Sequence, residues 1–230
     1  MKLQKETSSS DGHGKWYGDA CGTAFAMELI GERWSMLIVR ELMLGGRRFS
    51  DLRARLAGLS AKVLTERLVG LEQAGVLQKR VLPPPAASRI YELTPWGYHA
   101  EFAIRELGRW AARSPAHDPT LPMTPVGIML SMRTLIDPVA ARPLTGMIGF
   151  EADGESFVGH LGGGELNIVR GDTAGVDLLL RMRAPEELGI LLYAKVPVEV
   201  WEQGEGRAIE GDRELARQFI DLFALPEKIA

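Results

Sequence analysis

The chain has 230 residues, of which 46% are hydrophobic and 25% charged, a composition typical of globular proteins. This length exceeds the usual size of one domain, so we expect two. No apolar stretch is long enough to span a bilayer, and the N-terminus lacks the apolar core of a signal peptide, so the sequence predicts a cytoplasmic protein without membrane contact. The single cysteine, Cys21, excludes an intramolecular disulfide and a multi-cysteine zinc site.

The charge is distributed unevenly along the chain. Residues 1–115 contain 17 Lys and Arg against 12 Asp and Glu, a net charge of +5. Residues 116–230 contain ten against 18, a net charge of −8. A basic half can approach phosphates through counterion release, whereas an acidic half is repelled by them. The alternative is that the charges are scattered by chance between two ordinary domains.

Helical periodicity begins after a polar segment, residues 1–18, which reads as a disordered arm. We expect three helices in the following segment, over 20–30, 34–44 and 50–56. A fourth helix begins after Ser60, whose hydroxyl is a typical N-cap. Winding this helix at about 100° per residue places the apolar face at Leu64, Leu68 and Leu71. The opposite side carries Lys62, Val63, Glu66 and Val69.

A change to two-residue periodicity follows Gly75. Residues 76–82 and 88–93 are predicted to pair as a β-hairpin with a proline-rich tip over 83–87. Helices followed by a basic hairpin are typical of a winged helix, in which one helix enters the major groove and the hairpin lies along the backbone. Thr94 and Pro95 then supply a cap and a first-turn proline for a long amphipathic helix that ends near Ala112 and is suited to dimerisation.

Several segments of residues 19–114, in order, resemble the HxlR-type regulators: Gly31-Glu32-Arg33-Trp34, Arg48-Phe49-Ser50-Asp51-Leu52, Leu59 to Leu68, Leu71 to Val76 and Tyr91-Glu92-Leu93-Thr94. The resemblance implies a homodimer on palindromic double-stranded DNA, read by the helix that follows Ser60. The candidate DNA-binding residues are Arg47, Arg48, Ser60, Lys62, Val63, Thr65, Glu66, Arg67, Lys79, Arg80 and Arg89.

A proline-rich linker over 115–125 separates this domain from a second one over 126–230. The second domain is predicted to contain a helix at 125–135, strands at 145–151, 156–161, 165–170 and 176–182, and helices at 185–192 and 212–223. Glycine-containing turns separate the first three strands. The chain is therefore expected to combine a mainly α winged helix-turn-helix domain with an α+β domain built on one sheet.

The later part of the second domain, from Val176 to Leu192 and from Gly206 to the last helix, resembles the sterol-carrier-protein type of lipid-binding domain. That resemblance implies an apolar ligand between the sheet and the helices. The apolar residues available to line such a pocket are Met147, Phe150, Phe157, Ile168, Leu178, Leu180, Leu191, Leu192, Trp201 and Phe219. The alternative for each of them is an ordinary place in the core.

Motifs of catalysis are absent from the sequence. The four histidines are scattered, and there is no nucleophile elbow, P-loop or paired-carboxylate motif, so we expect neither an enzyme nor a bound metal or cofactor.

Cys21 lies near a helix start, and several HxlR-type proteins sense oxidants or electrophiles through a thiol at the matching position. The alternative is a small apolar side chain packed in a dimer interface.

The sequence therefore predicts a dimeric, DNA-binding transcriptional regulator whose acidic half binds an apolar small molecule or mediates assembly. The alternative is a lipid-binding or carrier protein whose helical half is a partner-binding module.

Overall fold

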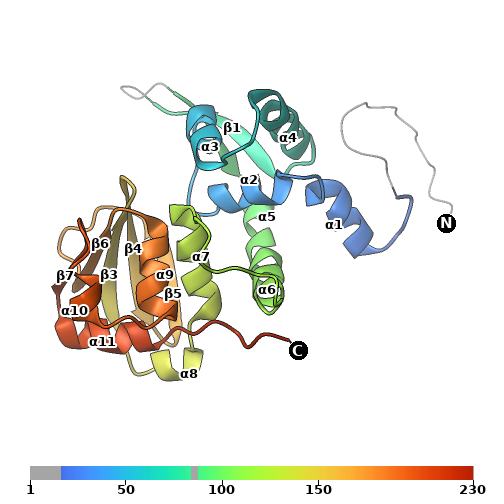
Figure 1. The fold of residues 1–230 in the computed structure, drawn as a ribbon. Coiled ribbons are helices and arrows are strands. Elements are labelled where there is room, and N and C mark those ends of the chain that lie inside the picture. The colour runs from blue at the N-terminus through green and yellow to red at the C-terminus, as the bar shows by residue number, and fades with distance from the viewer. Residues whose placement is uncertain (1–16, 84–87, 230) are drawn as a thin grey trace. The chain divides into compact units, whose positions relative to one another are not determined.

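The computed structural model describes residues 17–83 and 88–229 (Figure 1). It contains two compact units: residues 1–42 with 46–99, and residues 43–45 with 100–230. The arm predicted over 1–18 and the hairpin tip over 83–87 lie mostly outside the described residues. No helix in the described ranges combines the length and apolarity needed to cross a membrane.

The first unit is a helical core with a two-stranded hairpin (Figure 1). Its elements are α1 (Gly22–Ile30), α2 (Ser35–Leu42), α3 (Phe49–Arg55), α4 (Ala61–Gln73), β1 (Leu77–Val81), β2 (Arg89–Leu93) and α5 (Pro95–Tyr98). The helices pack through buried aliphatic residues, among them Ile38 on α2, Leu52 on α3 and Leu68 on α4. The helices and hairpin predicted for this part of the chain are present, with ends shifted by a few residues.

The prediction of one long helix after Thr94 was wrong. The Thr94 hydroxyl caps α5, as expected, but α5 ends at Tyr98 and a separate helix, α6, covers Ala100–Ala112. At the break, the His99 amide donates to the carbonyl of Trp96, three residues back, so the turn tightens before α6 begins. Gly97 lets α5 pack closely against the start of the hairpin, because a Cβ at this position would lie 2.0 Å from the Val76 carbonyl oxygen.

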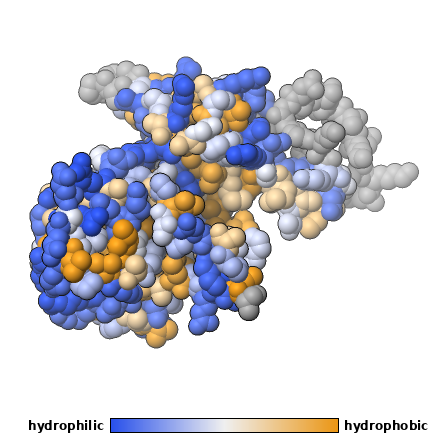
Figure 2. All heavy atoms as spheres, viewed as in Figure 1, coloured by the Kyte–Doolittle hydropathy of each residue, from blue (hydrophilic) through white to orange (hydrophobic). Residues whose placement is uncertain are grey.

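The second unit is an α+β domain built on one sheet, as predicted, and this sheet has five strands where four were expected. Its elements after α6 are α7 (Pro125–Leu135), α8 (Pro138–Ala141), β3 (Gly146–Ala152), β4 (Glu155–Gly162), β5 (Glu165–Arg170), β6 (Leu178–Met182), α9 (Pro185–Tyr193), α10 (Val198–Trp201), β7 (Ala208–Gly211) and α11 (Arg213–Asp221). The strand order is β5-β4-β3-β6-β7. In the view of Figure 2 this unit is largely hydrophilic at its surface, with a few apolar patches between the polar residues.

Turn chemistry and register explain the topology of this sheet. Positive φ angles at Asp153 and Gly154, and at Gly163 and Gly164, form the two tight turns of the β3–β4–β5 meander. Strand β6 then pairs parallel with β3, with Ile148 opposite Leu178, and β7 pairs antiparallel with β6. Strand β6 begins two residues later than predicted, and α8, α10 and β7 were not predicted, because four-residue elements carry too little periodicity.

The core of the second unit lies between the sheet and its helices. Nine of the ten predicted pocket residues are buried there, whereas Met147 is 38% exposed. Alternate residues of a strand point to opposite faces of the sheet. On β3, Ile148 and Phe150 point into the core, so Met147 points to the other face. The nine buried residues form part of the core between the sheet and the helices.

Candidate nucleic-acid interface

Helices α3 and α4 form a helix-turn-helix pair. The turn between them contains Gly58 at a φ of +84°, a conformation that favours glycine, and the Leu59 amide donates to the Leu56 carbonyl. The Ser60 hydroxyl then accepts a hydrogen bond from the Val63 amide at 3.2 Å, which confirms its prediction as the N-cap of α4. Leu64 and Leu68 anchor the inner face of α4 in the core.

The outer face of α4 presents the residues expected to read DNA. The side chain of Lys62 is 85% exposed and lies 4.0 Å from the Glu66 carboxylate. Thr65 and Glu66 are exposed, and Val63 is half-buried. Arg67 differs from the others, because its guanidinium pairs with Glu32 at 3.0 Å and donates to the Arg33 carbonyl. Its side chain therefore ties α4 to the loop before α2.

The three predicted cations of the wing lie on two faces of the hairpin. Lys79 is opposite Tyr91 and Arg89 is opposite Val81, so Lys79 and Arg89 share one face, whereas Arg80 lies on the other. Lys79 pairs with Glu72 on α4, and its ammonium lies 5.8 Å from the centroid of the Tyr91 ring. Arg80 pairs with Glu92 at 2.9 Å, whereas Arg89 is exposed beside the hairpin tip. Arg89 is thus the cation of this group best placed to approach a phosphate.

The two arginines before α3 connect the helices to the wing. The backbone of Arg47 exchanges two hydrogen bonds with Tyr91, which forms an isolated antiparallel bridge to the hairpin. Arg48 is exposed, and its Nε donates to the Ser88 hydroxyl at 3.1 Å. Arg48 therefore holds the start of α3 against the base of the hairpin tip.

Two further exposed arginines of this unit are absent from the predicted DNA-binding residues. Arg53 lies in the last turn of α3, and Arg33 lies before α2 with its guanidinium 5.5 Å from the centroid of the Trp34 ring. The available signal for Arg53 was its position on the outer side of the first helix of the pair. That helix crosses the DNA backbone in helix-turn-helix complexes.

Cys21 is exposed and occupies the N-cap position of α1. Its thiol pKa is lowered from the ordinary value, chiefly by the backbone amides of Thr23 and Ala24, because these N–H groups stabilise a thiolate at the helix start. The side chain is therefore accessible to solvent in this structure and is not part of the core. Elsewhere in the described ranges, no three His, Cys, Asp or Glu residues gather closely enough to hold a metal ion.

The comparisons with known proteins match this part of the chain. The profile of the HxlR-like helix-turn-helix family covers residues 29–118. The uncharacterised HTH-type transcriptional regulator YvaP of Bacillus subtilis (strain 168) is 38% identical over 86 residues, which are 37% of this chain and 80% of YvaP. The chain belongs to the HxlR-like helix-turn-helix family. The HTH-type transcriptional regulator YodB of the same organism is 37% identical over 37% of this chain and 77% of its own length.

Solved structures are also similar to part of the chain. Quinone-bound YodB from B. subtilis is 33% identical over 39% of this chain and 94% of its own chain, with a TM-score of 0.35. Reduced YodB is 33% identical over 44% of this chain and all of its own, with a TM-score of 0.39. The family profile ends at residue 118, so it does not identify the second unit.

Proposed function

We propose that this HxlR-like protein is a homodimeric transcriptional regulator that reads a palindromic operator with α4. The observation that carries the proposal is the outer face of α4, where Lys62, Thr65 and Glu66 project from a helix whose inner face is buried. The net charge of +5 on residues 1–115 supports binding to phosphates. Exposed Phe102 and Trp110 on α6 support self-association, because large exposed apolar residues favour an interface.

Replacing Lys62 with alanine is expected to weaken specific DNA binding by roughly 1–3 kcal/mol if the ammonium contacts a base. If it contacts a phosphate, the loss will be the same for all sequences. The measurement is a binding titration against the duplex that the wild-type protein selects from a random library, beside an unselected duplex.

Arg89→Ala serves as the matched control because Arg89 is an exposed cation on the wing, away from α4. Loss of a phosphate contact there should lower the salt dependence of binding by about one unit and leave the sequence preference unchanged. Unchanged affinity of the Lys62 variant for both duplexes would refute the assignment of α4 as the reading helix.

We also propose that Cys21 makes DNA binding sensitive to oxidants or electrophiles. Its exposure and lowered thiol pKa support this role, because the thiolate is the reactive form. Cys21→Ser is expected to bind DNA like the untreated wild type but to lose the response to oxidant, since a hydroxyl cannot be oxidised as a thiol is. DNA binding before and after treatment, followed by mass analysis of the thiol, measures this. An oxidised wild type with unaltered DNA affinity would contradict it.

For the second domain we propose binding of an apolar small molecule between the sheet and the helices. The resemblance of its later part to sterol-carrier-type domains and its single sheet with apolar residues toward the helices support this function. The negative charge of residues 116–230 argues against a second DNA-binding surface. The alternative, a carrier protein whose helical half binds a partner protein, is disfavoured by the family to which that half belongs.

A further inference from the structure

Helix α6 follows the winged helix directly in the sequence, yet its packing assigns it to the second unit. The family profile continues through this helix to residue 118. The contacts of α6 with α7, and with residues 227–229, explain why a helix of the family region is held by the other domain.

The end of α7 leaves backbone carbonyls without their usual partners, among them those of Arg133 and Thr134. In a continuing helix the Arg133 carbonyl would accept from the amide of residue 137, and the Thr134 carbonyl from that of residue 138. The Asp137 amide instead donates to the Leu222 carbonyl at 2.8 Å. Residue 138 is proline, which has no N–H. Two carbonyls that lie near one another at the end of α7 therefore need donors from elsewhere.

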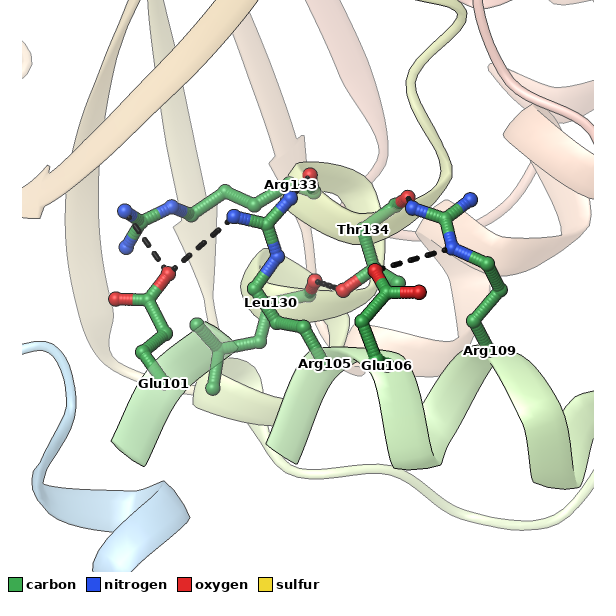
Figure 3. A network of polar contacts seen from close by, with 7 residues as sticks. All are labelled: Glu101, Arg105, Glu106, Arg109, Leu130, Arg133 and Thr134. Atoms are coloured by element: carbon green, nitrogen blue, oxygen red, sulfur yellow. Dashed lines mark hydrogen bonds and ion pairs between the residues drawn. The ribbon is translucent and has the colours of Figure 1, made fainter. Parts of the chain in front are cut away.

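Helix α6 supplies both donors (Figure 3). The guanidinium of Arg105 donates to the Arg133 carbonyl, and that of Arg109 donates to the Thr134 carbonyl. The two arginines are four residues apart and thus lie on one face of α6. We call these two hydrogen-bonded contacts the arginine clamp.

A carboxylate on each side of the clamp keeps the arginines in place. Glu101, one turn before Arg105, lies 3.0 Å from the Arg133 guanidinium and 3.6 Å from that of Arg105. Glu106 lies 3.3 Å from Arg109 (Figure 3). These partners limit the freedom of the long arginine side chains, so that less conformational entropy is lost when they bind α7.

The other end of α6 is held by a different segment of the second unit. The Lys228 ammonium donates to the carbonyls of Ala112 and Ser114 at 3.0 Å, and the Ile229 amide donates to the Arg113 carbonyl at 2.8 Å. Carbonyls that a helix end leaves unpaired are thus satisfied by residues that lie more than 100 positions later in the sequence.

Besides the clamp, α6 carries exposed apolar side chains. Phe102 and Trp110 are each 74% exposed, and Leu107 is 41% exposed. One helix therefore combines two arginines bound to the second domain with exposed apolar side chains that, under the proposed function, meet the same helix of a second copy.

We infer that α6 is the element through which the second domain controls DNA binding, with the arginine clamp as the connection. The inference rests on the proposed dimeric function. Two reading helices must be about 34 Å apart to enter successive major grooves. If α6 forms the dimer contact and is fixed to α7, any change in the second domain that moves the end of α7 also moves α6 and alters that separation.

The test uses the full chain with Arg105→Ala and Arg109→Ala combined. The matched control combines Arg142→Ala and Arg217→Ala, which removes the same charge from exposed positions of the second domain outside the clamp. Hydrogen exchange of the α6 amides and affinity for the wild-type-selected duplex are measured. Without the clamp, we expect α6 to exchange about tenfold faster and the DNA affinity to change by roughly fivefold or more, with the dimer retained.

The outcomes separate this inference from the proposed function. A wild-type protein that is monomeric or binds no duplex overturns the proposed function, and the inference with it. A dimeric, DNA-binding wild type whose clamp variant behaves like the control in both measurements overturns the inference alone. If the double variant does not fold, Arg109→Ala is measured instead, because it leaves the contacts of Arg105 with Glu101 and α7 intact.

Discussion

Replacing Trp201 with alanine is expected to destabilise the second domain by about 3–5 kcal/mol, the usual cost of removing a large buried aromatic side chain. Trp201 is fully buried although it lies on the four-residue helix α10. Its indole Nε1 donates to the Glu187 carbonyl at 2.7 Å, and the Arg207 guanidinium lies 5.8 Å from the centroid of its ring. The substitution leaves a cavity, removes the hydrogen bond from the indole to the Glu187 carbonyl and takes away the aromatic partner of Arg207.

The measurement is calorimetric unfolding of the full chain, in which the second domain's transition should fall by roughly 10 °C. Val200→Ala is the matched control, because Val200 precedes Trp201 on the same helix and is 52% exposed. A surface substitution of this kind should change stability by no more than about 0.5 kcal/mol. Equal effects of the two substitutions would show that the contacts of Trp201 do not stabilise the domain.

An apolar ligand in the second domain is expected to change DNA affinity by 5–150-fold, corresponding to a coupling free energy of about 1–3 kcal/mol. A ligand shifts an equilibrium only by its preference for one arrangement over another. DNA must therefore shift the ligand affinity by the same factor. Nine of the proposed pocket residues are buried, so a ligand between them must separate the side chains of the core. The ligand therefore prefers an arrangement of the second domain in which these side chains are apart. Titration of a fluorescent long-chain fatty acid, with and without duplex, measures both effects.

Leu180→Trp is expected to reduce binding of the fatty acid, because Leu180 is buried on the helix-covered face of β6. Leu179→Trp is the matched control, since the preceding residue of the strand points to the opposite face. Thermal unfolding verifies that each variant is folded, and Ile168→Phe replaces Leu180→Trp if the latter is not. If the wild type binds no fatty acid, or binds it without changing DNA affinity, the second domain is better assigned to assembly.

Local signals predicted the parts of the fold that depend on neighbouring residues. Helix α4 was predicted from the Ser60 cap and from leucines at helical spacing, and β5 from its alternation between glycine turns. The break at His99 was missed because it depends on contacts of α5 with the hairpin, which the continuous helical pattern of residues 95–112 does not reveal.

In the candidate site, too, features set by neighbouring residues could be predicted, whereas those set by tertiary contacts could not. The exposed face of α4 follows from helix geometry, so Lys62 and Glu66 could be placed from the sequence. Arg67 was grouped with them, but its pairing with Glu32 depends on how α4 packs against a loop 34 residues away. Arg105 and Arg109 read as an ordinary charged helix face. Their partners are backbone carbonyls that need other donors only because α7 ends at Leu135, just before Asp137 and Pro138.

The parallel pairing of β3 with β6 has a consequence for folding. Ile148 pairs with Leu178 although β4 and β5 lie between them in the sequence, so the centre of the sheet closes through contacts distant in sequence. Such contacts slow folding because loop-closure entropy is lost before they form. During synthesis the N-terminal domain folds first. Helix α6 is synthesised before α7, so Arg105 and Arg109 stay hydrated until the α7 carbonyls are available. The sheet on which α7 packs is completed later still.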